Sequence, residues 1–150
     1  MTDGTKGYWR LVETVWDEID IYESEQVFLS TYAKADRNAG LLFAAHFAQS
    51  EICNGGFNQF FWNSTGVLAS EAVEGMQLIG MSETAKIIAS AMQVFGEPYP
   101  RGRGPRQFKL EGVDKLALDA LDKEFFRLIA SEAGGFVIAA DAFVKHLLRK

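Results

Sequence analysis

The sequence predicts an all-α fold: a single compact bundle of about seven helices in one domain spanning residues 1–150. Apolar residues recur with a helical period along almost the whole chain, rather than with the alternation of strands. All three prolines and four glycines fall within residues 96–112, so helix breakers are concentrated in one connection. The chain is 48% apolar and 23% charged, an ordinary globular composition that excludes wholesale disorder.

The first half of the chain predicts an outer helix, a second helix and a central helix. One arc of the first is apolar and contains Leu11, Val12, Val15, Trp16 and Ile19. The second carries Val27, Phe28 and Tyr32. The third, over about residues 41–53, is so apolar that we expect it to be the most buried helix. Gly55-Gly56 should end it, because glycine accepts the left-handed backbone favoured at helix C-termini.

The second half predicts further helices separated by short breaks and by one long loop. A short helix carries Phe57, Phe60 and Phe61, and a turn over 63–66 leads into a helix over 67–79. Ser82 is the expected N-cap of the next helix. Residues 96–112 are predicted to be a loop, with at most a short extended piece over 107–110. Two final helices are expected over 113–128 and 136–148, separated by Gly134-Gly135.

The net charge of −5 conceals segments of opposite sign. Residues 1–37 hold eight acidic and four basic residues, and residues 38–100 hold five and one, so each segment carries −4. Residues 101–110 carry +4, from a predicted basic loop of Arg101, Arg103, Arg106 and Lys109. The acidic balance argues against direct nucleic-acid binding. The basic loop could meet phosphate, RNA or an acidic partner, or it could pair with the domain's own carboxylates.

The acidic residues near the N-terminus suggest a binding face. Glu13, Asp17 and Asp20 lie opposite the apolar arc of the first predicted helix, and Glu23 follows them. Carboxylates at i and i+4 are about 6 Å apart along a helix, so they could form a row of phosphate-like charge. The alternative is an ordinary solvated helix face. A binding role predicts a basic or DNA-binding protein as partner.

The densest motif lies at residues 51–66, where carboxamides alternate with aromatic residues. Its candidate binding residues are Asn54, Gly55, Gly56, Phe57, Gln59, Phe60 and Asn63. Gln59 and Asn63 should share a helix face, with their amides bonded to free groups of neighbouring helix ends. One interpretation is a tight helix-turn-helix junction. The other is a small-molecule or peptide pocket lined by Asn54, Asn58, Gln59, Trp62 and Asn63.

The pattern Glu-x-x-Asn-Gly-Gly-Phe-x-Gln-Phe-Phe-x-Asn-x-x-Gly over residues 51–66 resembles the signature of a bacterial domain-of-unknown-function family. The best-described member of that family is a DNA mimic protein. Weaker resemblance extends through Ile79-Gly80, Pro105-Arg106, Leu121-Asp122 and Phe125-Phe126. The resemblance implies an all-helical single domain and, for the mimic, sequestration of a transcription factor.

Candidate catalytic and metal-ligating residues are few. His46 and Cys53 share a helix face, but two ligands fall short of a zinc site. We interpret His46 as a hydrogen-bonded core histidine, and His146 lies near the last helix end. No phosphate-binding loop or dinucleotide fingerprint is present. We therefore expect no metal, no cofactor and no enzymatic activity; an enzyme using His46 is the third possibility.

The remaining expectations concern location and assembly. A single cysteine fits a reducing compartment, and residues 1–7 are polar and predicted to be flexible, with no apolar signal core. No apolar run is long enough for a membrane span. These features predict a cytoplasmic protein. The apolar stripe of the last helix could serve a core or a homodimer face. The leading hypothesis is a non-enzymatic protein-binding domain.

Overall fold

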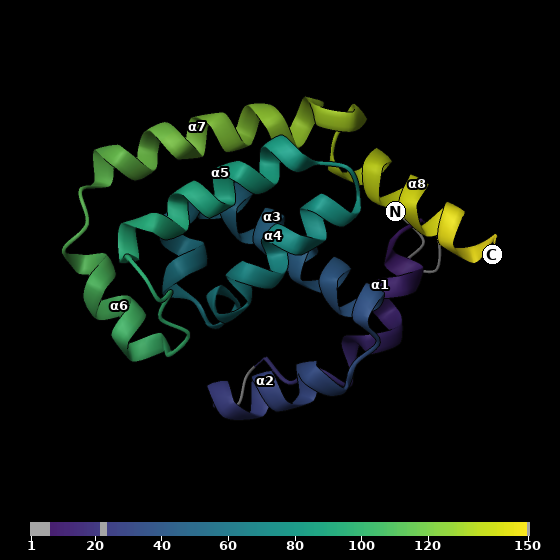
Figure 1. Cartoon of the computed structure of the whole chain (residues 1–150), viewed down its shortest axis with the longest axis horizontal. Coiled ribbons are helices and arrows are strands. Elements are labelled where there is room, and N and C mark those ends of the chain that lie inside the picture. Colours follow the sequence, from purple (N-terminus) through teal and green to yellow (C-terminus); the bar gives the residue numbers. More distant parts are fainter. Residues whose placement is uncertain (1–6, 22–23, 150) are drawn as a thin grey trace.

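The computed structural model describes residues 7–21 and 24–149, which contain helices and no strand (Figure 1). The α-helices in this part are α1 Trp9–Trp16, α2 Glu25–Lys34, α3 Arg37–Trp62, α4 Ala69–Leu78, α5 Ser82–Met92, α6 Arg103–Glu111, α7 Lys115–Ser131 and α8 Phe136–Leu148. Three short 3-10 helices join them: η1 Ser64–Leu68, η2 Gln93–Phe95 and η3 Glu132–Gly134. The all-α prediction is confirmed, with eight α-helices in the described ranges instead of about seven.

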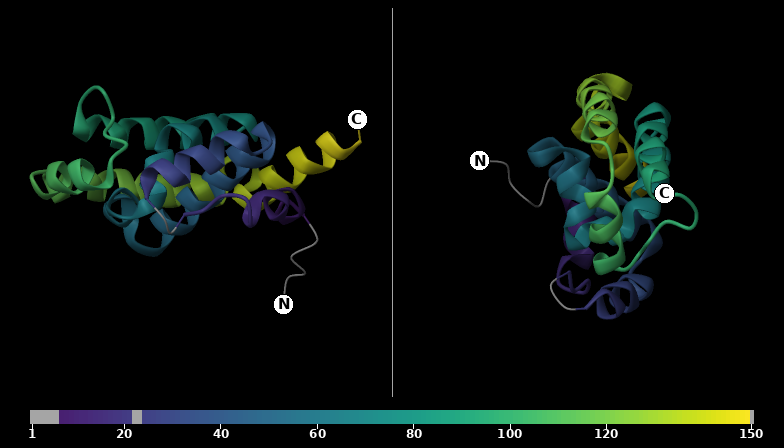
Figure 2. Two further views of the ribbon diagram at one scale, coloured as in Figure 1. Left: turned by 90° about the horizontal axis from the view of Figure 1, so that it is seen from below. Right: turned by 90° about the vertical axis from the view of Figure 1, so that its left-hand side faces the viewer.

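Helix α3 is the centre of the structure, as the sequence predicts. It packs against α1, α4, α6 and α7, and α5 lies between α4 and α7. Figure 1 shows α7 along one edge of the molecule beside α5, and α2 at the opposite edge. The contact between α3 and α4 is close at Gly75, where an added Cβ would collide with the backbone carbonyl of Leu41. Figure 2 shows α8 extending beyond the other helices at one end.

Helix α3 consists of two helical segments joined at a break. The backbone leaves the helical region at Gly55 (φ −146°, ψ 19°) and Gly56 (φ 74°, ψ −177°). The predicted end of the central helix at these glycines is confirmed, and the short segment after it buries Phe57, Phe60 and Phe61. The first segment begins at Arg37, several residues earlier than predicted, because Asp36 caps it by accepting a hydrogen bond from the Ala39 N–H.

Helix α6 occupies the second half of the segment predicted to be a loop. The prediction of a loop over 96–112, with an extended piece over 107–110, is wrong from Arg103 onward. Pro105 is the third residue of α6, where a helical N–H has no intrahelical partner, so its missing donor costs nothing. Gly102 precedes the helix in an extended conformation, and only residues 96–102 form a connection without helix.

Helix α1 is shorter than its apolar arc suggests. It ends at Trp16, although Ile19 beyond it is still buried at 4% exposure. Asp17 and Glu18 follow directly, and carboxylates at a helix C-terminus are opposed by the negative end of its dipole. The predicted flexible residues 1–6 lie outside the described ranges. Gly7 is described and accepts a hydrogen bond from the Arg10 N–H.

The N-terminus of α5 is capped by a residue from a distant part of the chain. The predicted N-cap Ser82 is instead the first helical residue, and the N-cap position is Met81, whose side chain makes no capping bond. The carboxylate of Glu132 accepts hydrogen bonds from the Glu83 and Thr84 N–H groups at 2.8 and 2.7 Å and from the Thr84 hydroxyl. The local cap prediction is therefore wrong, because a tertiary contact supplies the acceptor.

Replacing Glu132 with alanine should destabilise the fold by about 1 kcal/mol at pH 7, because three donors lose their acceptor. Burial raises the pKa of Glu132, but the hydrogen bonds from Thr84 and Glu83 outweigh it, and the pKa is lowered overall. The stabilisation is thus present above the ordinary glutamate pKa and is lost as the pH falls through the lowered value. Urea unfolding of both proteins at pH 7 and pH 3 measures this, with Glu124→Ala as the exposed control.

Candidate functional site

The carboxamides of the motif bind one another through the carboxylate of Glu51. Its Oε2 accepts hydrogen bonds from Gln59 Nε2 at 2.7 Å and from Asn63 Nδ2 at 2.9 Å. Asn54 Nδ2 donates to Gln59 Oε1 at 3.1 Å, which joins the residues before and after the break. Gln59 and Asn63 therefore share a face, as predicted. Their predicted partners at free helix ends are wrong, since Glu51 stands close enough to take both amides.

The second segment of α3 is capped from helix α7. Asp122 Oδ1 accepts a hydrogen bond from the Phe57 N–H at 2.8 Å. An added Cβ on Gly56 would lie 2.5 Å from Asp122 Oδ2, so only glycine lets this carboxylate approach the backbone. Burial raises the pKa of Asp122, and the Phe57 hydrogen bond partly opposes that effect. Sequence reasoning missed this role, although Leu121-Asp122 belongs to the resemblance quoted above.

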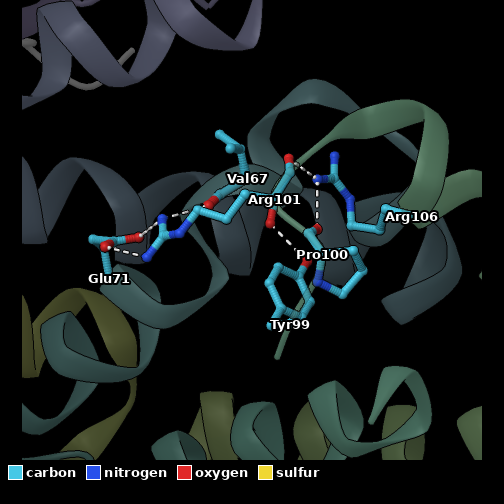
Figure 3. A network of polar contacts seen from close by, with 7 residues as sticks. Val67, Glu71, Tyr99, Pro100, Arg101 and Arg106 are labelled. Atoms are coloured by element: carbon cyan, nitrogen blue, oxygen red, sulfur yellow. Dashed lines mark hydrogen bonds and ion pairs between the residues drawn. The ribbon is translucent and has the colours of Figure 1, made fainter. Parts of the chain in front are cut away.

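Arg106 closes the other end of the same helical segment. Its side chain is fully buried at 0% exposure, and its guanidinium donates to backbone carbonyls of the described chain. Nε bonds Phe61 O at 2.6 Å and Nη2 bonds Asn63 O at 2.8 Å, which are carbonyls at the end of α3. Nη1 bonds Arg101 O at 2.8 Å, as Figure 3 shows. Burial lowers the pKa of Arg106 from its ordinary value. Arg106, which was predicted to lie in a basic surface loop, is thus a buried residue that caps the C-terminal end of α3.

Arg101 is half-exposed, and its guanidinium is held by Glu71 and a backbone carbonyl. It donates to both carboxylate oxygens of Glu71, at 2.8 and 3.0 Å, and to Val67 O at 2.9 Å (Figure 3). Beside it the hydroxyl of the half-buried Tyr99 donates to Gly66 O at 2.7 Å, and burial raises the pKa of Tyr99. The sequence left open that the basic segment pairs with carboxylates of the same domain. Arg101 makes such a pair, with Glu71.

The other two predicted cations lie at the surface. Arg103 is exposed, and its Nε donates to the Trp62 carbonyl at 3.1 Å. Lys109 is also exposed and donates to the Phe95 carbonyl at 3.3 Å. The four charges predicted to form one basic loop are thus separated: Arg106 is buried and Arg101 is paired with Glu71, whereas Arg103 and Lys109 are exposed on α6. Sequence alone could not show this split, because the loop prediction placed all four outside any helix.

The candidate binding residues of the motif are largely engaged with one another. Phe57 and Phe60 lie in the core, and the side chains of Asn54, Gln59 and Asn63 have the partners described above. Asn58 and Trp62 are exposed. The cavities beside α1 and α3, between α2 and α4, and between α1 and α8 are lined by residues outside the motif. These contacts favour the junction interpretation over a pocket at the motif.

His46 is enclosed by aromatic side chains. Its Nδ1 lies 2.9 Å from the Tyr8 hydroxyl, and its ring contacts Tyr8, Trp9 and Phe47. Burial lowers the pKa of His46 to about 4. Cys53 is exposed, and partial burial raises the pKa of its thiol, the direction opposite to that of an activated nucleophile. Within the described residues, no three His, Cys, Asp or Glu side chains are grouped to hold a metal.

The lowered pKa of His46 predicts acid sensitivity. The unfolded chain takes up the histidine proton near pH 6.5, whereas the folded protein does so only near pH 4. Stability should therefore fall by about 3 kcal/mol between these values, and remain unaffected by this group above pH 6.5. Unfolding free energies across pH 4–7 check this, because His46→Gln should lack that part of the pH dependence. In contrast, His146→Gln, which alters an exposed side chain, should follow the wild type.

The acidic residues near α1 remain at the surface. Glu13, Asp17 and Glu18 are exposed, and the ion pairs between described residues involve none of them. The predicted helical row is wrong beyond Glu13, because α1 ends at Trp16, Asp17 is its C-cap and Asp20 lies past the helix; Asp20 is half-buried and its N–H donates to Thr31 Oγ1. Glu23 lies outside the described residues. The acidic face thus comprises the exposed end of α1 and the turn after it.

The described helices include none with both the length and the apolar character needed to cross a bilayer. Comparison with curated proteins and with solved structures gives no significant match. A family model does match, and its description is DMP19-like protein. The match covers residues 33–146, which include the complete motif, Arg106 and Asp122, but exclude α1. The chain therefore belongs to the DMP19-like protein family, which includes a DNA mimic protein.

Proposed function

We propose that this protein binds a basic, DNA-binding protein through the acidic residues at the end of α1 and so occupies the surface that would otherwise contact DNA. One observation carries the proposal. Residues 11–33 contain six acidic residues and no lysine or arginine, and the exposed carboxylates of Glu13, Asp17 and Glu18 make none of the described ion pairs. Exposed negative charge of this kind attracts a positively charged surface.

The placement of the cations of residues 101–110 supports the same proposal. Four cations at the surface would oppose binding to a basic partner. Arg106 is instead buried and the charge of Arg101 is paired with that of Glu71, so half of that positive charge is either buried or compensated. Membership of a family that includes a DNA mimic agrees with this proposal. However, α1 lies outside the matched residues, so the proposed surface rests on the charges of this chain itself.

The proposal can be tested with immobilised protein and a mixture of bacterial DNA-binding proteins enriched on heparin. The test variant Glu13→Gln/Asp17→Asn/Glu18→Gln removes three charges on α1 and in the turn directly after it, with little change of shape. The matched control Glu97→Gln/Glu111→Gln/Asp119→Asn removes three exposed charges elsewhere. We expect the wild type and the control to retain one or more of these proteins at low salt and to release them as salt rises. The α1 variant should not retain them.

Two results would contradict this function. Equal retention by the α1 variant and by its control would show that the acidic end of α1 is not the contact surface. Retention that is indifferent to salt would exclude an interaction dominated by exposed charges. Displacement of the retained proteins by double-stranded DNA would further support competition for one surface. Failure of DNA to displace them would contradict the mimicry while leaving protein binding in place.

A further inference from the structure

A small cavity lined by apolar residues opens beside the acidic residues at the end of α1 and just after it. Its volume is about 80 Å³, and every lining residue is apolar: Trp16, Ile19, Ile21, Phe43 and Phe47. Phe43 is buried, whereas the Trp16 ring is stacked on Phe47 with centroids 5.5 Å apart and remains 40% exposed. A tryptophan that is held in place by packing yet reaches solvent is the kind of side chain that dominates protein interfaces.

The exposed charged side chains next to Trp16 along the described chain are acidic. Asp17 and Glu18 follow Trp16 directly, Glu13 lies one turn before it, and all three are exposed. The nearest preceding base is Arg10, at the other end of α1. A neutral or acidic partner would gain only the apolar contact here. In contrast, a segment with an apolar side chain flanked by lysine or arginine would match both the cavity and its surroundings.

We propose that the basic partner inserts one aliphatic side chain into this cavity, while its flanking lysine and arginine residues contact Glu13, Asp17 and Glu18; the inference rests on the function proposed above. The cavity has room for a side chain of about the size of leucine. Because aromatic packing holds its walls, binding requires little ordering of this surface. The inserted side chain adds affinity that salt does not screen, whereas the surrounding charges give the salt-sensitive part.

The test uses two synthetic peptides that are identical in lysine and arginine content and differ only in one central residue, leucine or alanine. Their affinities for the protein are measured by fluorescence anisotropy across a range of salt concentrations. We expect the leucine peptide to bind roughly five- to thirtyfold more tightly, since three buried carbon groups are lost on changing to alanine. Both peptides should show the same dependence of affinity on salt.

Three variants separate the two contributions. Trp16→Ala should abolish the difference between the peptides and leave the salt dependence unchanged. Asp17→Asn/Glu18→Gln should weaken both peptides and reduce the salt dependence, but preserve the leucine preference. Phe108→Ala is the matched control, because it removes an aromatic ring that is 80% exposed on α6. Should Trp16→Ala not fold, Ile21→Ala alters the cavity from the turn, and the comparison of peptides on the wild type stands without any variant.

The outcomes distinguish this inference from the function on which it rests. Binding that is salt-sensitive but equal for the two peptides overturns the inserted side chain and leaves the acidic surface intact. Absence of binding by either peptide at low salt overturns both. Sedimentation provides a further check, because self-association that Trp16→Ala abolishes would assign the cavity to a second copy of this chain and overturn the inference.

Discussion

Replacing Arg106 with leucine should destabilise the protein by about 3–5 kcal/mol, the largest effect expected for any single substitution proposed here. The guanidinium is the donor to the carbonyls of Phe61, Asn63 and Arg101, and leucine would leave these acceptors buried without it. The bonds join the end of α3 to the connection before α6. Thermal and urea unfolding, followed by circular dichroism, measure the loss.

Two further substitutions sharpen this result. Arg106→Lys should recover only a small part of the stability, because a single ammonium group cannot reach carbonyls that lie on different sides of a planar guanidinium. Arg103→Leu, which alters an exposed arginine on the same helix, should change the unfolding free energy by less than about 1 kcal/mol. A comparably small loss for Arg106→Leu would show that Arg106 does not hold the junction together.

Replacing Gly56 with alanine should destabilise the protein by about 2–4 kcal/mol. Its φ of 74° is unfavourable for alanine, and the new Cβ would lie 2.5 Å from Asp122 Oδ2. The carboxylate would have to move, and the Phe57 N–H would lose its hydrogen bond. The unfolding free energy of the variant, measured in urea, gives the effect.

A double-mutant cycle separates the two causes of this loss. In an Asp122→Ala background the collision is absent, so Gly56→Ala should cost only the backbone part, about 1–3 kcal/mol, since φ 74° with ψ −177° is a conformation essentially restricted to glycine. Gly104→Ala is the control, because Gly104 lies within α6 and an added Cβ there has no neighbour within 4 Å. That substitution should be neutral or slightly stabilising. Equal losses for Gly56→Ala in both backgrounds would contradict the role of Asp122.

Periodicity was sufficient to predict the helices whose stability comes from burying one face. The central helix, the break at Gly55-Gly56 and the last helix all follow from apolar spacing and from glycine. It was insufficient for α6. The apolar pattern there is short, and Gly102, Gly104 and Pro105 made the sequence look like a loop although it forms a helix. Proline in a first helical turn obeys different rules from proline in a helix interior, and composition alone does not distinguish the two positions.

The candidate site was predicted less completely than the fold. The sequence indicated that Gln59 and Asn63 share a face, because that follows from helical spacing. The side chains that cap the helices could not be predicted in the same way. Glu132 caps α5, and Asp122 caps the second segment of α3, across 48 and 65 residues of chain. Such partners are brought together only by the packed fold, and one sequence shows no spacing that indicates them.

The burial of Arg106 has a consequence for how the motif can be used. The helical segment after Gly56 is capped at its N-terminus by the carboxylate of Asp122 from α7 and at its C-terminus by the guanidinium of Arg106 from α6. Both caps of this segment are therefore supplied by parts of the chain that follow it in sequence. A nascent chain released only as far as residue 66 would contain the whole signature but neither of its caps. The signature is thus not a portable module, and its shape exists only after the chain beyond it has folded.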